Sequence, residues 1–432
     1  MNPSLLARLL WVVVSLFYTY QYVLRILPSI VINDLMNKFA IDATQIGLFS
    51  GIYYIGYTLI HIPMGIMLDR FGAKLMMTIS VLLTALGLVP MIYSDSWTLV
   101  MIGRIITSIG SATSTLGAFK LLRIAYGEEK FGLSLGFVVT AGLLGAACNT
   151  EIRGLMDIYG TSEILHIILL TGFGLAAFTY AMIPSEAKLN SIYASNVEQI
   201  NDNTKNHSNT TVWQDVKHVM SDYRVILIAL MGGFMVGPLE GFADAWLMPF
   251  LENVYHLSSQ QIGIGSKALF IGVCIGFPLV GYIAEETRAY YGTAIVCGVI
   301  MLFSFIALLL GIGNVGFEIF GYQLNLVHTL LFLLGFVCGY QICIITEITN
   351  IMPIRILAIS SATANMIMMI FGTVFHFLIG AIISSNSTDN LTVGAYSSDA
   401  LVKGFIVVPI AIFIAIIVLS FLALKKRSNL AK

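Results

Sequence analysis

Twelve long apolar runs constrain the fold of this chain more than any other feature. Each run is continuous, and none shows the inside/outside alternation of a barrel strand. Each is about 20 residues or longer, which is the length that a helix needs to cross a bilayer. The sequence therefore predicts an all-α membrane protein with twelve transmembrane helices. Their approximate limits are 10–31, 45–68, 75–94, 98–123, 131–156, 164–183, 224–250, 262–284, 292–312, 326–351, 357–383 and 402–424.

The composition excludes several other classes of protein. Hydrophobic residues make up 58% of the chain and charged residues only 10%, with a mean hydropathy of +0.89. Soluble domains carry about 25% charged residues. The net charge of −1 gives no basic surplus for nucleic acid. The five cysteines form no CxxC pair and no Cys/His cluster with zinc spacing, so we expect no disulfide framework, no metal site and no cofactor.

A polar stretch divides the runs six and six, and the two halves resemble each other at an offset of 216 residues. An internal repeat of six helices is typical of transporters built from two related bundles. We expect a six-helix bundle over 1–184, a cytoplasmic linker ending in a short amphipathic helix over 185–223, and a second bundle over 224–432. The matches are Gln45-Ile46-Gly47 with Gln261-Ile262-Gly263, Ser50 with Ser266, Ile55-Gly56 with Ile271-Gly272, Gly65 with Gly281, and Asp69 with Glu285.

The basic residues predict the orientation. Of the 22 Lys and Arg residues, 16 fall in the two tails, in the loops that share their side, or at the run ends that adjoin these loops. Lys and Arg gather on the cytoplasmic side of membrane proteins. The sequence therefore predicts a multi-pass protein of the cell inner membrane, in contact with the lipid bilayer, with both termini in the cytoplasm.

The loop between the second and third runs carries a motif, Gly65-Ile66-Met67-Leu68-Asp69-Arg70-Phe71-Gly72-Ala73-Lys74. It fits G-x-x-x-D-R-x-G-x-K/R and resembles the signature of the major facilitator superfamily, which stands at the same place. The resemblance implies two six-helix bundles, transport by alternating access, and usually a monomer. It also implies that the motif latches the cytoplasmic side in the outward-open state. The residues to which this role is carried are Gly65, Asp69, Arg70, Gly72 and Lys74.

Two further stretches match the motifs of the family only in part. Arg104 in the fourth run resembles an arginine of a second family motif, although Ser108 stands where the family has glycine. The second-half copy, Gly281 to Glu285, is degenerate, because Glu286 follows where a basic residue is expected.

A few ionisable residues lie inside the predicted spans. A charge at the bilayer centre costs about 2.5–3.5 kcal/mol on insertion scales, so it normally faces a cavity or a partner. Arg25 lies in the first run, Glu240 and Asp244 lie in the seventh, and Lys267 lies in the eighth. The offset aligns Arg25 with Gly241, next to Glu240, so the first helix of each half offers a charge at nearly the same height.

These charges suit a small zwitterion at the central cavity that the resemblance implies. Arg25 can hold a carboxylate through two parallel hydrogen bonds. Glu240 or Asp244 can hold an ammonium group or take up a coupling proton, and Lys267 can neutralise one of these acids. Salt bridges that only gate, Arg25 with Glu240 or Lys267 with Asp244, are the alternative interpretation. Further candidates for lining the cavity are Tyr22, Tyr54, Tyr340 and Gln341.

The stretch from Tyr20 to Ser29 is similar to the first helix of the phagosomal nutrient transporters of intracellular bacteria. That resemblance implies proton-coupled uptake of an amino acid or a similar metabolite. The alternatives are a transporter of organic anions such as sugar acids or organophosphates, a drug efflux antiporter, and a non-transporting membrane sensor. The absence of HExxH, GxSxG and GxxxxGK[ST] argues against an enzyme.

Overall fold

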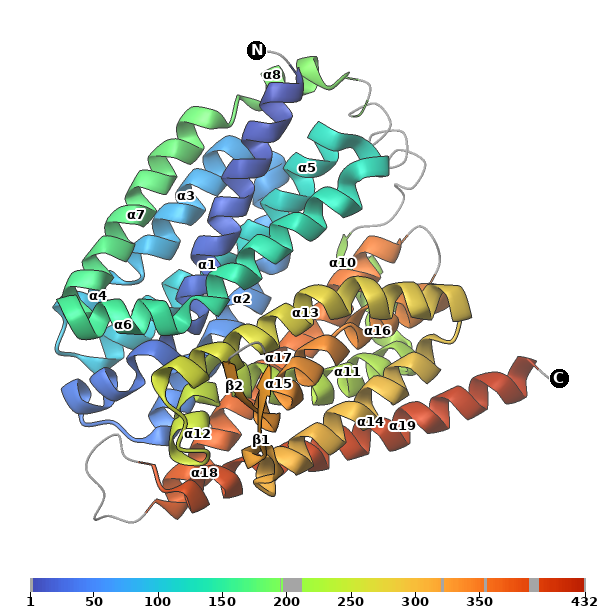
Figure 1. Cartoon of the computed structure of the whole chain (residues 1–432). Coiled ribbons are helices and arrows are strands. Elements are labelled where there is room, and N and C mark those ends of the chain that lie inside the picture. The colour runs from blue at the N-terminus through green and yellow to red at the C-terminus, as the bar shows by residue number, and fades with distance from the viewer. Residues whose placement is uncertain are drawn as a thin grey trace. The chain divides into compact units, whose positions relative to one another are not determined.

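The computed structural model describes residues 3–194, 196, 212–319, 322–352, 356–387 and 396–430. Twelve helical segments among them are long and apolar enough to cross a membrane, so the predicted fold class is confirmed (Figure 1). The chain divides into two compact units. The first consists of Met1–Leu27 and Ile52–Asn209, and the second consists of Pro28–Gly51 and Thr210–Lys432.

Two helices are shared between the units. Helix α1 passes from the first unit to the second at Leu27/Pro28, and α2 returns at Gly51/Ile52. Helix α5 holds two spans joined at Gly127, whose φ of +67° breaks the helix. The helices that begin in or belong to the first unit are α1 (Pro3–Phe39), α2 (Ala43–Phe71), α3 (Ala73–Leu86), α4 (Val89–Tyr93), α5 (Trp97–Ala147), α6 (Asn149–Tyr159), α7 (Thr161–Met182) and α8 (Glu186–Ile192).

In the second unit, several spans are built from consecutive short helices. The seventh span joins α11, the π-helix η1 and α12, the tenth joins α15 and α16, and the twelfth joins α18 and α19. The elements are α10 (Val212–Ser221), α11 (Tyr223–Gly241), η1 (Phe242–Trp246), α12 (Leu247–Asn253), α13 (Ser259–Thr287), α14 (Tyr290–Leu309), the 3₁₀-helix η2 (Ile312–Asn314), β1 (Gly316–Ile319), β2 (Tyr322–Asn325), α15 (Leu326–Val337), α16 (Tyr340–Ile351), α17 (Leu357–Asn386), α18 (Ser398–Phe405) and α19 (Val407–Leu430).

Two local features differ from the sequence expectation. Strands β1 and β2 form an antiparallel pair in whose register Phe317 is paired with Leu324, whereas the sequence predicts an all-α chain. Helices also extend past their apolar runs, since the first run covers 10–31 and α1 covers Pro3–Phe39. An apolar run measures the hydrocarbon core alone, whereas helical hydrogen bonding continues into the interface. Within the expected linker, residues 195 and 197–211 lie outside the described residues.

Small residues allow neighbouring helices to approach closely. In the first unit α3 lies beside α5 and α7 (Figure 1), and a Cβ atom added at Gly110 would collide with Ser80 and Thr84 of α3. Ser80 donates a hydrogen bond to Thr113 across the same contact, at 2.8 Å. Membrane helices associate through such small residues and interhelical hydrogen bonds, because lipid tails remove the hydrophobic driving force.

One pair of repeat-related glycines makes equivalent contacts in its own unit. Gly56 of α2 packs against Ser108 in the fourth span, and Gly272 of α13 packs against the carbonyl of Phe332 in the tenth. In each half, a glycine of the second span therefore meets the fourth span. This equivalence supports the internal repeat read from the sequence.

The segment Pro28–Gly51 packs within the second unit. Gly47 lies against the carbonyl of His376 on α17, leaving no space for a Cβ atom. Asp42 accepts a 2.6 Å hydrogen bond from Ser384, and Thr373 donates one of 2.8 Å to the carbonyl of Gly51. The C-terminal part of this segment, from Asp42 to Gly51, is therefore fastened to α17.

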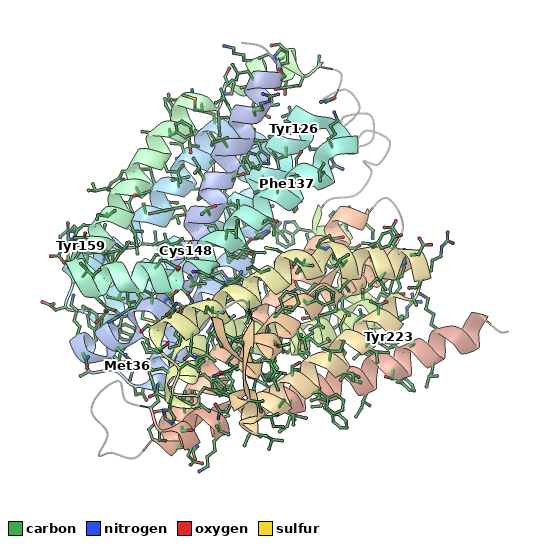
Figure 2. The ribbon with its side chains drawn as sticks, in the orientation of Figure 1. Met36, Tyr126, Phe137, Cys148, Tyr159 and Tyr223 are labelled. Carbon is green, nitrogen blue, oxygen red and sulfur yellow. The ribbon has the colours of Figure 1, made fainter. Side chains whose placement is uncertain are left out.

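None of the five cysteines forms a disulfide bond. Cys148 is exposed at the junction of α5 and α6 (Figure 2), while Cys274 is half-buried. The three others, Cys297, Cys338 and Cys343, are buried.

Candidate functional site

An aromatic and cationic face lies on α1 and α2 in the first unit. Arg25 is half-buried, and its Nη2 donates a 2.7 Å hydrogen bond to the hydroxyl of Tyr54. Its guanidinium carbon lies 5.3 Å from the ring centroid of Tyr22 and 5.1 Å from that of Tyr54. A cation over an aromatic face is attracted by the ring quadrupole. The structure thus brings together three of the predicted site residues.

Further hydrogen bonds fix the surrounding aromatic side chains. Tyr53 donates to Oε1 of Gln21 at 2.9 Å. The hydroxyls of Tyr57 and Thr115 are 2.8 Å apart. Because each bond joins different helices, the orientation of these rings is set by the packed bundle.

Glycines on α5 determine how close the α1 tyrosines can lie. A Cβ atom at Gly142 would come within 2.6 Å of the Tyr18 ring and 2.9 Å of the Tyr22 ring. A larger residue would displace both rings, and Tyr22 contacts Arg25. Gly142 therefore contributes to the shape of this face, which the sequence analysis did not recognise.

Arg104 contacts the backbone of α1 at Arg25. Its side chain is 4% exposed, and Nη1 and Nη2 donate to the carbonyls of Leu24 and Arg25 at 2.6 and 2.7 Å. Its guanidinium also lies 4.6 Å from the centroid of the Tyr53 ring. Sequence reasoning identified Arg104 without these acceptors, because backbone carbonyls leave no signal in a sequence.

The predicted acids and Lys267 belong to the second unit. Glu240 is half-buried near the end of α11, and Asp244 is 4% exposed within η1. Such π-helical turns are frequent at functional sites. Lys267 is half-buried on α13.

Tyr340 and Gln341 lie side by side at the start of α16, which packs against α11. Tyr340 is fully buried, and no hydrogen-bond partner for its hydroxyl exists among the described residues. Gln341 is half-buried.

The loop motif is held by two residues from elsewhere in the first unit. Lys120 bridges Asp69 at 3.3 Å and Glu186 at 2.8 Å. Oε2 of Glu186 accepts from the backbone N–H of Ala73 at 3.3 Å, at the first residue of α3. A carboxylate is favourable there because helix N-termini carry partial positive charge. Gly72 has φ +82°, and a Cβ atom there would lie 2.7 Å from Glu186.

The remaining motif residues make fewer contacts. Lys74 lies 4.2 Å from the ring centroid of Tyr180, and Arg70 is exposed. Among the described residues, no atom lies within 4 Å of a Cβ atom added at Gly65. The cation that pairs with Asp69 is thus the ammonium of Lys120, while Glu186 lies at the N-terminus of α3.

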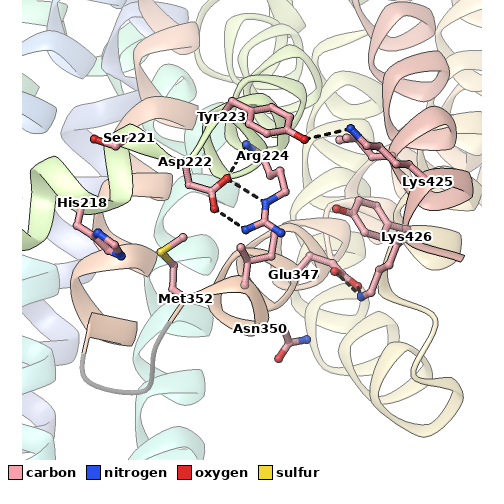
Figure 3. Close-up of a pocket in the computed structure, with 13 residues that line it drawn as sticks. His218, Ser221, Asp222, Tyr223, Arg224, Glu347, Asn350, Met352, Lys425 and Lys426 are labelled. Atoms are coloured by element: carbon pink, nitrogen blue, oxygen red, sulfur yellow. Dashed lines mark hydrogen bonds and ion pairs between the residues drawn. The ribbon is translucent and has the colours of Figure 1, made fainter. Parts of the chain in front are cut away.

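A second polar site is a pocket of about 710 Å³ formed within the second unit (Figure 3). Asp222 and Arg224 form an ion pair of 2.6 Å on one side. On the other side, Lys426 bridges Glu347 at 2.8 Å. The side chain of Glu347 is only 4% exposed, so a nearly buried carboxylate depends on one lysine from α19.

Comparisons with known proteins agree with this architecture. The sequence model of the Major Facilitator Superfamily matches residues 10–376. The chain is 23% identical over 259 residues to the uncharacterized MFS-type transporter YxaM of Bacillus subtilis, covering 58% of this chain and 61% of that protein. It is 22% identical over 272 residues to the probable L-galactonate transporter of Escherichia coli, covering 61% and 58%. The chain thus spans about six-tenths of the length of these relatives.

Solved structures share the fold. A bacterial homologue of the human lysosomal transporter Spinster has a TM-score of 0.73 at 15% identity, with 97% of each chain covered. The nucleoside transporter NupG has a TM-score of 0.68 at 12% identity, covering 95% of this chain and 99% of that one. The twelve apolar helices, the repeat, the loop motif and the family match lead to one conclusion: this chain belongs to the Major Facilitator Superfamily.

Proposed function

We propose that the protein is a secondary transporter that moves a small solute by alternating access between two six-helix bundles, residues 1–184 and 224–432. The family supports this proposal, as do relatives whose names describe transporters. The protein is not an enzyme in this proposal, and it uses no cofactor. It works as a monomer in the cell inner membrane with both termini in the cytoplasm, in keeping with the distribution of its basic residues.

The observation that carries the solute assignment is the guanidinium of Arg25, held by Tyr54 between two tyrosine rings inside a membrane span. A fixed planar guanidinium matches a carboxylate. Arg25 therefore binds the carboxylate of a small zwitterion such as an amino acid. Glu240 or Asp244 binds the ammonium group, and Lys267 neutralises the other of these two acids. The residues that complete the lining are Tyr22, Tyr54, Tyr340 and Gln341.

Proton coupling is assigned to Glu240, with Asp244 as the second acid. An acid couples transport to a proton gradient when burial makes its charged form costly enough to exchange a proton near neutral pH. The loop motif, with Asp69, Arg70 and Lys74, controls the cytoplasmic gate. The ion pairs of Lys120 with Asp69 and with Glu186 support this role. Such pairs can break and form again when a gate opens and closes.

The test is uptake into proteoliposomes of radiolabelled amino acids, with and without an inward proton gradient. We expect gradient-driven uptake of at least one amino acid and its loss in Arg25→Ala. Arg25→Lys should retain part of the uptake, because lysine keeps the positive charge but lacks the two parallel N–H groups of the guanidinium. Glu240→Gln should retain exchange of internal for external solute and lose the response to the gradient. Full uptake by Arg25→Ala would contradict the carboxylate assignment.

Organic-anion transport is the second candidate. It is favoured by the relative named a probable L-galactonate transporter, since a sugar acid presents a carboxylate without an ammonium group. In that case labelled galactonate would enter the proteoliposomes and amino acids would not compete. Arg25 would still be required, while Glu240→Gln and Asp244→Asn would leave the KM for galactonate unchanged.

A further inference from the structure

Helix α1 contains a proline, which leaves one backbone carbonyl of the helix without its usual N–H donor. Pro28 lies inside the helix, and proline has no backbone N–H. The carbonyl four residues earlier, that of Leu24, therefore loses its helical donor, and the proline ring crowds it. Inside a membrane no bulk water replaces that donor, so an unsatisfied carbonyl is costly.

Arg104 supplies the missing donor. Nη1 reaches the carbonyl of Leu24 at 2.6 Å, and Nη2 reaches the next carbonyl, that of Arg25, at 2.7 Å. The planar guanidinium presents two parallel N–H groups, which suits two successive carbonyls on one side of a helix. Its 4% exposure and its contact with the Tyr53 ring hold it in place.

We propose that Arg104 is a positioning residue, which replaces the hydrogen bond that Pro28 removes and thereby fixes the backbone of Arg25. The chain passes from the first compact unit to the second at Leu27/Pro28, directly after the two carbonyls that Arg104 binds. The two hydrogen bonds from Arg104 hold the backbone of Arg25 in place when α1 bends at Pro28. The guanidinium of Arg25 therefore stays directed at Tyr54. The role of Arg25 in solute binding rests on the proposed function, whereas the replacement of the lost hydrogen bond does not.

The test is a double-mutant cycle on purified protein in detergent. Arg104→Gln should lower the thermal unfolding midpoint, because the Leu24 carbonyl then has no strong donor. Pro28→Ala restores a backbone N–H at position 28, so Pro28→Ala/Arg104→Gln should recover most of that loss. Pro63 of α2 is also inside a helix of the first unit and offers the matched control. Pro63→Ala/Arg104→Gln should recover nothing. Equal recovery with Pro63→Ala, or none with Pro28→Ala, would overturn the proposal.

Transport kinetics separate positioning from stability alone. With the radiolabelled amino acid whose uptake depends on Arg25, Arg104→Gln should raise KM about tenfold, as for the loss of one well-placed charged hydrogen bond, and change kcat much less. The double variant should restore KM, and Arg104→Lys, which reaches only one carbonyl, should be intermediate. An unchanged KM in Arg104→Gln would refute the positioning role. If no amino acid is transported, the assignment of a zwitterionic solute fails, and the unfolding midpoints still decide whether Arg104 compensates for Pro28.

Discussion

The guanidinium of Arg25 is hydrogen-bonded to the hydroxyl of Tyr54 at 2.7 Å, so a solute carboxylate would meet a cation that is already oriented. Removing that hydroxyl in Tyr54→Phe should raise KM about threefold to tenfold, in line with a hydrogen bond to a charged group. Initial uptake rates in proteoliposomes measure this. Tyr53→Phe is the control, because the hydroxyl of Tyr53 bonds Gln21 instead. A larger effect in the control would contradict the role of Tyr54.

Gly72→Ala should destabilise the protein by about 1–3 kcal/mol, because φ +82° with ψ 157° belongs to a region that essentially only glycine adopts. The new Cβ atom would also press on Glu186. Differential scanning fluorimetry measures the loss of the unfolding midpoint. Gly136→Ala is a matched control in α5, because no atom in the described part of the chain lies within 4 Å of its would-be Cβ, and its midpoint should stay at or above wild type.

Lys426→Met should destabilise the second unit by on the order of 2 kcal/mol, because it leaves the nearly buried Glu347 carboxylate without its cation. The value is below that for a fully buried pair, since the Lys426 side chain is 48% exposed. Lys425→Met is the control, because Lys425 is exposed and donates to the hydroxyl of Tyr223 at 3.1 Å.

The double variant Lys426→Met/Glu347→Leu tests whether the unpaired carboxylate of Glu347 causes the loss of stability. Removing both charges should recover the midpoint to near wild type. If the double variant is less stable than Lys426→Met, the carboxylate of Glu347 has another role in the pocket.

Asp42 should make stability sensitive to acid. Burial alone would raise its pKa, but hydrogen bonds from Ser384 and from the backbone of Gln45 outweigh it, and the pKa lies below the ordinary 3.8. A depressed pKa in the folded state means that the stabilisation is present above pH 3.8 and is lost as the pH falls through the lower folded value. Asp42→Asn, which keeps a helix-capping side chain, should therefore flatten the fall of the unfolding midpoint below about pH 4.

Unfolding midpoints of wild type and Asp42→Asn, measured between about pH 3 and pH 7, give this difference. Carboxylates common to both proteins cancel in the comparison. Parallel acid limbs in the two proteins would contradict the assignment to Asp42.

The sequence predicts the twelve helices well because hydrocarbon thickness fixes how long an apolar run must be, and it identifies Arg25 because a cation in such a run is conspicuous. Other features depend on contacts far apart along the chain. Glu186 lies 114 positions after Gly72, in a stretch that reads as the start of a polar linker, yet it contacts the motif loop. The carbonyls that Arg104 binds depend on how α5 packs against α1, which a sequence does not record.

The accessible thiol of Cys148 offers a built-in handle for spectroscopy. Three of the other four thiols are buried and Cys274 is half-buried, so a maleimide dye should react with Cys148 first. Cys148 ends α5, the helix that also carries Arg104. A fluorophore attached there would follow conformational exchange in the natural sequence, without removal of the remaining thiols.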